Sequence, residues 1–470
     1  MEIPKEAKSI IEELIKRKFE AFIVGGCVRD LLMNKKPKDW DITTNAKPEE
    51  IQKIFPKSFY ANKFGTVTVN DVEITTYRID EKYSDKRHPD KIRFARTIEE
   101  DLARRDFTIN AVAMGLDKKL IDLFQGKKDL KNKIIRTVGK PEERFNEDAL
   151  RMLRAARFAT TLGFKIEPKT LKAMEKNAGW IQAISKERIK DELMKILEAE
   201  KPTEGIELLR KTKLLGYILP ELEKGVGVSQ NKFHIYDIYE HSIRSLQAAA
   251  DKKFNLEVRF AALFHDIGKP ETKEGEGPDS TFYNHDYVGA KFTARILQRL
   301  KFPKKFIEKV VILVRNHMFI SDPDRITEAG ARRLIRRVGL KNMPDLINLR
   351  MADRLGMGRP KARPYRLRTI EYLIEKVSQD PISVKMLKIN GNDIMDLLKI
   401  QPGPKIGALL DVLLAEVIEN PEKNTKNYLE KRVKELDEED LEKLRKMAQK
   451  KIEEKKEEED LKIRGKYWIK

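Results

Sequence analysis

The chain has 470 residues, which is too long for a single hydrophobic core, and its one cysteine excludes a disulfide framework within the chain. The 96 Lys and Arg residues outnumber the 76 Asp and Glu residues, and the net charge of +20 favours a polyanionic partner such as nucleic acid. A thermophile's charged surface is the alternative explanation. Because the N-terminus has no signal core and no run approaches the ~20 apolar residues of a membrane helix, we expect a cytoplasmic protein without a membrane partner.

The first elements predict a small α/β head. Apolar residues at helical spacing predict a helix over residues 5–19, and residues 22–24 read as a short buried strand that ends at two glycines. The alternating, β-branched residues 66–78 predict a hairpin. Residues 104–111 open with two arginines and then resemble the start of an apolar strand or helix.

From about residue 140 the pattern is helical nearly to the end of the chain. Breaks are expected near Pro202, at residues 225–227 and in the proline-bearing stretch 358–364. The last ~45 residues are rich in Lys and Glu, and we expect a solvated helix there rather than a frayed tail.

Glycines and carboxylates stand close together after the first strand. Gly25, Gly26 and Arg29 are followed by Asp39 and Asp41. Strand residues two apart point to the same side, so the two carboxylates would meet at one point and repel unless a cation lay between them. Mg²⁺ favours carboxylates combined with substrate phosphates, and a glycine turn lets backbone N–H groups approach a phosphate. The sequence therefore predicts a Mg²⁺ and phosphate site; a surface turn before a half-exposed strand is the alternative.

Residues 22–44 resemble the first motif of the bacterial (class II) tRNA CCA-adding and poly(A) polymerase family, whose head has the nucleotidyltransferase fold of DNA polymerase beta. Residues 104–111 resemble the second motif, which implies that Arg105 contacts the incoming nucleotide. Glu73 stands in the predicted hairpin near the aspartates, and a third carboxylate often completes such sites as a ligand or base. An ordinary exposed strand residue is the alternative for Glu73.

Residues 147–158 carry the most specific signal. As one helix, they would place Asp148, Arg151 and Arg154 three apart on one face, with Arg157 continuing the stripe. Simple ion pairs along the helix are the alternative. A carboxylate beside a guanidinium matches the hydrogen-bonding edge of a nucleobase. The resemblance implies that Asp148 and Arg151 choose CTP and ATP, and that Arg154 and Arg157 hold the triphosphate.

Four further segments resemble parts of the same family. Residues 122–130 match the join of head and neck, and residues 185–193 match a neck helix with a packing and positioning role. Residues 83–90 match a loop that helps the switch from adding C to adding A. Residues 396–407, with Pro-Gly-Pro at a helix–helix turn, resemble a C-terminal segment, and basic helices there fit the backbone of the tRNA elbow.

Five of the six histidines are clustered within 84 residues: His234, His241, His265, His285 and His317. Imidazole and carboxylate ligands drawn from several helices are typical of metal sites in helical bundles. The order His…His-Asp…Asp resembles the HD phosphohydrolase superfamily. The metal ligands that this resemblance implies are His241, His265, Asp266 and Asp353, with Mg²⁺ or a divalent transition metal. His285 and His317 would add a second metal or bind phosphate.

The predicted fold class is therefore α+β, with a polymerase beta-like head at residues 1–138, a base-recognising helical neck at 139–228, an HD-type helical domain at 229–375 and a tRNA-binding helical tail at 376–470. The resemblance implies an enzyme that adds CMP, CMP and AMP from CTP and ATP to the 3′ end of tRNA and releases pyrophosphate. Phosphatase or 2′,3′-cyclic phosphodiesterase activity is a further implication of the HD segment. The alternatives are a poly(A) polymerase, a CC-only or A-only enzyme, or a protein that acts mainly as an HD phosphohydrolase. A non-catalytic RNA-binding role is the least favoured. Oligomeric state and the identity of the HD metal stay open.

Overall fold

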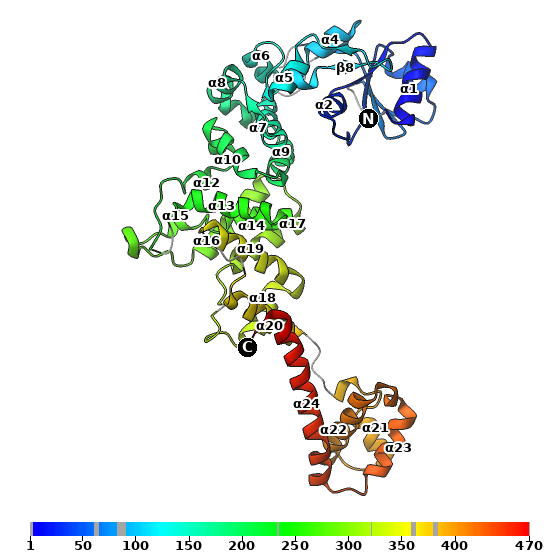
Figure 1. The fold of residues 1–470 in the computed structure, drawn as a ribbon, viewed down its shortest axis with the longest axis vertical. Coiled ribbons are helices and arrows are strands. Elements are labelled where there is room, and N and C mark those ends of the chain that lie inside the picture. The colour runs from blue at the N-terminus through cyan, green and yellow to red at the C-terminus, as the bar shows by residue number, and fades with distance from the viewer. Residues whose placement is uncertain are drawn as a thin grey trace. The chain divides into compact units, whose positions relative to one another are not determined.

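The computed structural model describes residues 3–60, 65–81, 91–232, 235–320, 322–358, 363–378 and 384–469. The chain forms two compact units (Figure 1), one of residues 1–317 with 348–360 and one of residues 318–347 with 361–470. This division falls inside the segment 229–375 proposed from sequence. None of the helices in the described ranges is both long and apolar enough to cross a bilayer.

A mixed sheet forms the core of the head, with the strand order β3-β4-β5-β2-β1-β8-β9. β1 runs antiparallel to β2 and β8, whereas β2 runs parallel to β5. The strands of this sheet are β1 (Ala21–Val24), β2 (Asp41–Thr44), β3 (Phe59–Tyr60), β4 (Thr66–Val69), β5 (Val72–Thr76), β8 (Ala113–Met114) and β9 (Leu120–Ile121). A separate hairpin joins β6 (Arg78–Glu81) to β7 (Lys91–Phe94).

The head also contains five short helices, of which α1 and α2 pack against β1 (Figure 1) and α3 packs against β4. They are α1 (Lys5–Lys16), α2 (Gly26–Leu32), α3 (Pro48–Ile54), α4 (Ile98–Ala103) and α5 (Gly126–Asn132). The hairpin predicted at residues 66–78 is confirmed as β4–β5, and its turn residues Asn70 and Asp71 have positive φ, as a tight hairpin turn requires. Residues 104–111 form neither a strand nor an α-helix, but a turn and a short 3₁₀ helix over Thr108–Asn110.

The neck is helical and adjoins a parallel pair of short strands, β10 (Ile134–Ile135) and β11 (Lys165–Ile166). Its helices are α6 (Pro141–Glu147), α7 (Leu150–Leu162), α8 (Pro168–Asn177), α9 (Lys186–Glu198), α10 (Pro202–Lys211), α11 (Leu214–Ile218) and α12 (Pro220–Glu223). The single helix expected over residues 147–158 is wrong. The chain leaves the helix at Asp148, whose backbone is extended (φ −143°, ψ 104°). The Asp148 side chain accepts a hydrogen bond from the backbone N–H of Leu150 (3.1 Å), which stabilises a break rather than a continuous helix.

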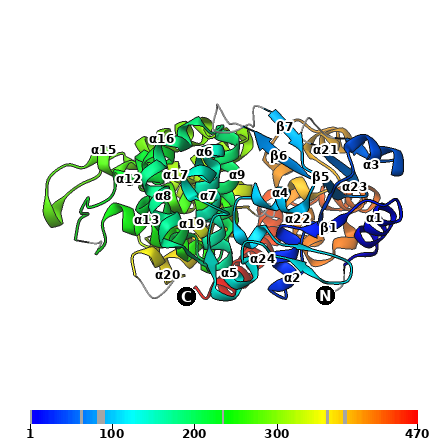
Figure 2. The same cartoon turned by 90° about the horizontal axis from the view of Figure 1, so that it is seen from above.

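The remaining helices of the first unit pack as a bundle in which α14 contacts α13 and α17, and α16 contacts α17. Figure 2 shows α13, α16 and α17 of this bundle. They are α13 (Ile238–Asp251), α14 (Leu256–Phe264), α15 (Lys269–Thr272), α16 (His285–Arg299), α17 (Lys304–Asn316) and, from Asn348 onward, α19 (Met343–Gly356). Phe260 and Phe264 are fully buried between these helices. The apolar run before His265 is therefore a core helix that brings the histidine into the bundle.

The second unit is also helical, with α24 packed against both α20 and α22. Its helices are α18 (Glu328–Val338), α20 (Tyr365–Ser378), α21 (Gly391–Leu398), α22 (Pro404–Glu419), α23 (Lys426–Leu436) and α24 (Leu441–Tyr467). The expected C-terminal helix is confirmed as α24. Asp460 of α24 pairs with Lys376 of α20 at 2.8 Å, so the charged helix is anchored although most of its side chains are exposed.

An ion pair between a buried carboxylate and a partly exposed arginine joins the head to the neck. Asp106 accepts hydrogen bonds from Nε (2.8 Å) and Nη2 (2.7 Å) of Arg154 on α7, and from the side-chain amide of Asn110 (3.1 Å). Burial by itself raises the pKa of Asp106, but Arg154 and Asn110 stabilise the carboxylate and lower that pKa to about 2. The ionised form of Asp106 is thus part of what holds α7 on the head.

We predict that Asp106→Asn removes a pH-dependent part of the stability. A carboxyl group whose pKa is lowered on folding contributes stability above its unfolded pKa, about 3.9, and loses it as the pH falls toward its folded value. The difference in unfolding free energy between the wild type and Asp106→Asn should therefore shrink by about 2 kcal/mol between roughly pH 5 and pH 2. Urea titrations followed by the fluorescence of Trp180 in the neck, in a Trp40→Phe and Trp468→Phe background, measure it.

Asp117→Asn, which changes an exposed aspartate of the head, is the matched control and should show a constant difference from the wild type. Parallel pH profiles for the wild type and Asp106→Asn would contradict the stabilising role of the ionised carboxylate.

Candidate functional site

The first cluster lies at one end of the head sheet. β1 ends at Val24, and its antiparallel neighbour β2 begins at Asp41, so the glycines after β1 adjoin the first residue of β2. In the parallel ladder of β2 and β5, Asp41 stands opposite Glu73. Residues paired in register point to the same side of a sheet, so these two carboxylates share one face.

Asp39 reaches the same place from outside the sheet. The strand begins only at Asp41, so the expectation that Asp39 and Asp41 are alternate residues of one strand is wrong; Asp39 lies in a bend and is exposed. Burial raises the pKa of Asp41, and the charges of Glu73 and Asp39 raise it further, whereas Arg105 opposes them. Asp41 and the two carboxylates whose charges act on it make a site that a divalent cation would stabilise, and an all-oxygen donor set suits Mg²⁺.

Gly25 leaves room between the carboxylates and an arginine. Its φ of +81° favours glycine, and a Cβ there would lie 3.1 Å from Nη1 of Arg105 and 3.7 Å from Oδ2 of Asp41. Arg105 is held by the fully buried Asp101, which accepts from its Nη2 at 3.0 Å. The Nε of Arg105 is buried and has no hydrogen-bond partner among the described residues. This N–H donor has no acceptor among those residues, and the adjacent turn at Gly25 has no side chain, so the two together suit a phosphate oxygen.

Three of the arginines predicted to bind phosphate gather around one aromatic ring. The guanidinium carbons of Arg29, Arg154 and Arg157 lie 5.3, 5.4 and 3.6 Å from the centre of the Phe158 ring. Each also has a protein partner. Arg29 donates to Asp30 and Asn110, Arg154 to Asp106, and Arg157 to Glu192. The structure thus brings these arginines together and neutralises part of their charge.

Gly26 begins α2, and the space beside its Cα is bounded by the guanidinium of Arg29, whose Nη2 would lie 3.7 Å from an added Cβ. Gly26 and Arg29 are therefore neighbours in space as well as in sequence. Because glycine has no side chain of its own, another group can approach the backbone of Gly26 closely.

Asp148 and Arg151 lie on either side of the helix break, and each has its own partner. Nη1 and Nη2 of Arg188 on α9 donate to the two carboxylate oxygens of Asp148, at 3.2 and 2.7 Å. Arg151 is buried and donates to Glu147 and to the backbone carbonyls of Arg104 and Arg144. The carboxylate is therefore oriented by the neck helix α9, and the guanidinium is tied to the loop that carries the second motif.

A second cluster lies in the helical bundle, where His241 on α13, His265 after α14 and Asp353 on α19 form a buried group able to hold a metal ion. Nε2 of His241 lies 3.0 Å from Nε2 of His265 and 3.2 Å from Oδ1 of Asp353, and Nε2 of His265 lies 3.7 Å from the same oxygen. Nitrogen and oxygen atoms converge on one point from three helices, as a metal site in a bundle requires.

Asp266, His285 and His317 form a second such group. Nδ1 of His285 lies 2.7 Å from the carbonyl oxygen of Phe282, and Nδ1 of His317 lies 2.7 Å from that of Val314. A carbonyl only accepts, so each Nδ1 carries a proton and, in the neutral ring, each Nε2 presents a lone pair. These Nε2 atoms face each other at 3.3 Å. Two lone pairs at that distance repel, and a cation that both can bind removes the repulsion.

Asp266 connects the two groups. Its Oδ2 lies 3.3 Å from Nε2 of His265, and its Oδ1 lies 3.5 Å from Nε2 of His285. Lys269 donates to Oδ2 of Asp266 at 2.7 Å and to Gln230 at 2.6 Å, and it is itself buried. Burial alone raises the pKa of Asp266, yet His265 and Lys269 lower it well below its ordinary value. An ionised carboxylate between two sets of imidazoles is the arrangement expected for a pair of metal ions.

Sequence patterns did not identify three residues that support these clusters. Asp101 stands three and four positions before Arg104 and Arg105 on one helical turn, and Lys269 stands three positions after Asp266, so helical spacing carried a signal for both. Arg188 is 40 positions from Asp148, and nothing local indicated the contact. His234 and the loop at residues 83–90 lie outside the described residues.

Three known family models match successive segments of this chain. Family models match for the poly(A) polymerase head domain over residues 21–136, for a probable RNA- and SrmB-binding site of polymerase A over residues 163–225, and for the HD domain over residues 238–355. These ranges include the head cluster, much of the neck and all six residues of the bundle cluster.

Full-length relatives are also found. The A-adding tRNA nucleotidyltransferase of Deinococcus radiodurans is 34% identical over 407 residues, which cover 84% of this chain and 90% of that protein. The CCA-adding enzyme of Ligilactobacillus salivarius is 34% identical over 441 residues, covering 93% and 97%. The crystal structure of the Bacillus stearothermophilus CCA-adding enzyme in complex with CTP matches with a TM-score of 0.61 at 30% identity, covering 93% and 98%. The chain therefore belongs to the family of CCA-adding tRNA nucleotidyltransferases, in a form that carries an HD domain.

Proposed function

We propose that the chain is a template-independent tRNA nucleotidyltransferase that adds CMP, CMP and AMP to the 3′ end of tRNA from CTP and ATP and releases pyrophosphate. The observation that carries the proposal is the meeting of Asp41, Glu73, Gly25 and Arg105 at one end of the head sheet. Carboxylates for a divalent cation and an open donor for a phosphate stand side by side there. A single buried thiol, Cys27, suits a reducing cytoplasm, where tRNA is processed.

Asp39 and Asp41 would hold Mg²⁺, which lowers the pKa of the attacking 3′-hydroxyl and neutralises the triphosphate. Glu73, paired with Asp41 across the ladder, is placed to complete the ligand set or to take the hydroxyl proton. Arg105 and the turn at Gly25 and Gly26 hold phosphate oxygens. The arginines around Phe158 face their own carboxylates, so a triphosphate must compete with Asp106 and Glu192 for them.

Base choice is assigned to Asp148 and Arg151. Cytosine and adenine each present an amino donor beside a ring-nitrogen acceptor, whereas uracil and guanine present the reverse pattern. A carboxylate accepts from the amino group, and a guanidinium donates to the ring nitrogen. Because Arg188 donates to both oxygens of the Asp148 carboxylate, that carboxylate is held in one orientation for the remaining contact. GTP or UTP would leave these groups unpaired, which is costly in a dry pocket.

A second activity, metal-dependent phosphoester hydrolysis, is favoured by the two buried metal-binding groups bridged by Asp266. His241, His265 and Asp353 would hold one divalent ion, and His285 and His317 a second, with Asp266 shared between them. Lys269 places a cationic donor beside the shared carboxylate, where it is positioned to bind a phosphate oxygen.

The product of nucleotide addition can be tested directly, because one relative is named an A-adding tRNA nucleotidyltransferase and another a CCA-adding enzyme. A tRNA lacking its CCA end should gain two C residues with CTP alone, and CCA with CTP plus ATP. A tRNA ending in CC should gain one A. Gel analysis of labelled tRNA reads each outcome, and a long A tail, addition of only C, or addition of only A would each contradict the proposal.

Asp41→Ala should lower the rate of addition by about a thousandfold, since the ligand is worth several kcal/mol of charge stabilisation. The control, Asp71→Asn, changes an exposed aspartate at the β4–β5 turn and should keep the wild-type rate. Equal rates for Asp41→Ala and the control would remove the metal-site assignment.

Arg188 is expected to act as a positioning residue for Asp148. Arg188→Ala should reduce the preference in kcat/KM for CTP over UTP by about tenfold, because the freed carboxylate samples other orientations. Arg188→Lys should recover part of that preference, and Lys186→Ala, on the same helix, should leave it unchanged. A variant that loses rate equally with all four nucleotides would show a structural role instead.

The bundle cluster is expected to bind about two divalent ions per chain, measured by elemental analysis after loading with Mn²⁺. His265→Ala and His285→Ala should each lose metal and hydrolysis of a phosphodiester probe while tRNA extension is retained. Gly268→Ala should do the same, because its Cβ would lie 2.3 Å from the carbonyl oxygen of His285 and 2.5 Å from the backbone nitrogen of Gly289. Gly407→Ala, where a Cβ meets nothing within 4 Å, is the control. Full metal content in all three variants would contradict the site.

A further inference from the structure

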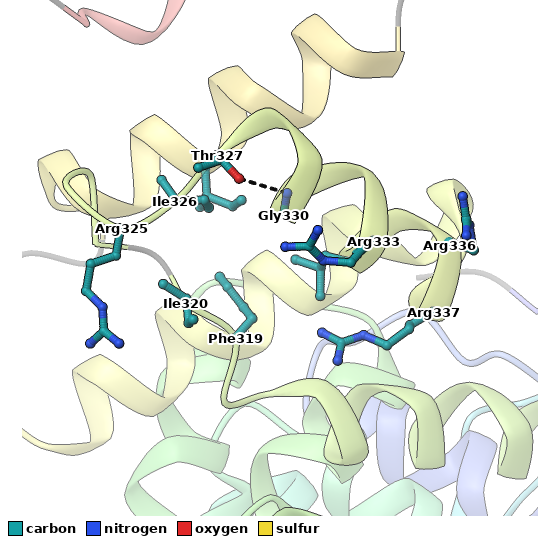
Figure 3. A pocket seen from close by; sticks show the side chains of 11 residues that line it. Phe319, Ile320, Arg325, Ile326, Thr327, Gly330, Arg333, Arg336 and Arg337 are labelled. Atoms are coloured by element: carbon teal, nitrogen blue, oxygen red, sulfur yellow. Dashed lines mark hydrogen bonds between the residues drawn. The ribbon is translucent and has the colours of Figure 1, made fainter.

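A cavity of about 410 Å³ lies in the second unit beside α18, and none of its lining residues belongs to either cluster. Phe319, Leu334 and Ile370 form an apolar floor, all of them buried. Arginines surround that floor. In Figure 3, Phe319 and Ile320 lie between Arg325 on one side and Arg333 and Arg337 on the other.

These arginines have no carboxylate partner. Arg325, Arg333, Arg336 and Arg337 line the cavity, all are exposed, and none of their guanidinium groups forms an ion pair or hydrogen bond with another described residue. No carboxylate is among the lining residues in the described part of the chain. By contrast, their neighbour Arg332, on the outer side of α18, pairs with Glu328 at 3.1 Å.

Two of these arginines lie one helical turn apart on α18. Arg333 and Arg337 are four residues apart, so they project from one face with their Cβ atoms roughly 5–6 Å apart. Each guanidinium offers a planar fork of donors that matches two phosphate oxygens. Two forks at that separation match successive phosphates of one strand, and the exposed Ile320 offers an apolar contact for a ribose between them.

We propose that this arginine-lined cavity binds the sugar-phosphate backbone of the RNA substrate, an assignment that rests on the proposed tRNA nucleotidyltransferase function. Unpaired, exposed arginines suit a partner that supplies several phosphates at once. The cavity offers no acceptor set for reading a base, so RNA backbone is favoured over a free nucleotide. The site extends the RNA contact from the predicted tail, residues 376–470, to residues 319–337.

The test is tRNA binding by the full chain carrying Arg333→Ala and Arg337→Ala. At about 0.15 M salt the dissociation constant should rise roughly tenfold, and the slope of log K against log salt should decrease by about 1.5, because two phosphate contacts are lost. Fluorescence anisotropy with labelled tRNA measures both quantities. The KM for CTP and ATP on saturating tRNA should stay at the wild-type value.

The control removes two positive charges from the same region with Arg332→Ala and Lys341→Ala, neither of which lines the cavity. It should change affinity and slope far less. Thermal unfolding curves check that both double variants are folded; all the substituted side chains are exposed.

Equal affinity and slope for the two double variants would overturn the RNA-binding cavity while leaving the catalytic proposal intact, provided that the wild type extends tRNA. A raised KM for nucleotides with unchanged tRNA binding would overturn it in favour of a free nucleotide. A wild-type chain that neither binds nor extends tRNA would overturn both proposals together.

Discussion

The ion pair between the buried Asp106 and the partly exposed Arg154 is the constraint on which the head site depends. It connects the loop after α4 with α7, so the helix that carries Arg151 and Arg157 is held beside the sheet end that carries Asp41. Burying a charge is costly unless it is paired and hydrogen-bonded, and Asp106 meets both conditions through Arg154, Asn110 and the backbone N–H of Phe107. Breaking this contact would free α7 from the loop that follows α4.

Each cluster contains groups that repel one another in the protein alone, either like-charged carboxylates or facing lone pairs. In the head, the charges of Asp39 and Glu73 disfavour ionised Asp41. In the bundle, His285 and His317 present facing lone pairs at 3.3 Å. Each arrangement is unfavourable in the protein alone, and each is relieved by a cation. The surrounding core, from the buried strands of the head to Phe260 and Phe264 of the bundle, provides the stability that holds these groups in place.

The described arginines of this chain occur in two environments, one with carboxylate partners and one without them. The arginines near the head site are paired with Asp101, Asp106 or Glu192, which sets their direction and reduces their net charge. The arginines around the cavity at α18 have no such partners among the described residues. Directed, partly neutralised arginines suit a small triphosphate that must be placed accurately, whereas free ones suit a long polyanion whose attraction depends on salt.

Much of this organisation could be read from local patterns. The β4–β5 hairpin and the C-terminal helix follow from alternation and helical periodicity, because such patterns depend on neighbours in the chain. The motifs also indicated the α+β head before a helical remainder. The pattern failed at Asp148, whose side chain competes with the backbone and interrupts the expected helix, and it also failed to show that β2 begins only after Asp39.

By itself, the sequence determined which residue types were available for metal, phosphate and base contacts, and roughly which elements carry them. The tertiary structure alone decided that Asp266 lies between two groups of histidines, that Arg188 holds Asp148 from 40 positions away, and that the arginines of α18 surround an apolar cavity. These contacts join segments distant in the chain. Their formation depends on how whole helices pack, and no local spacing encodes that.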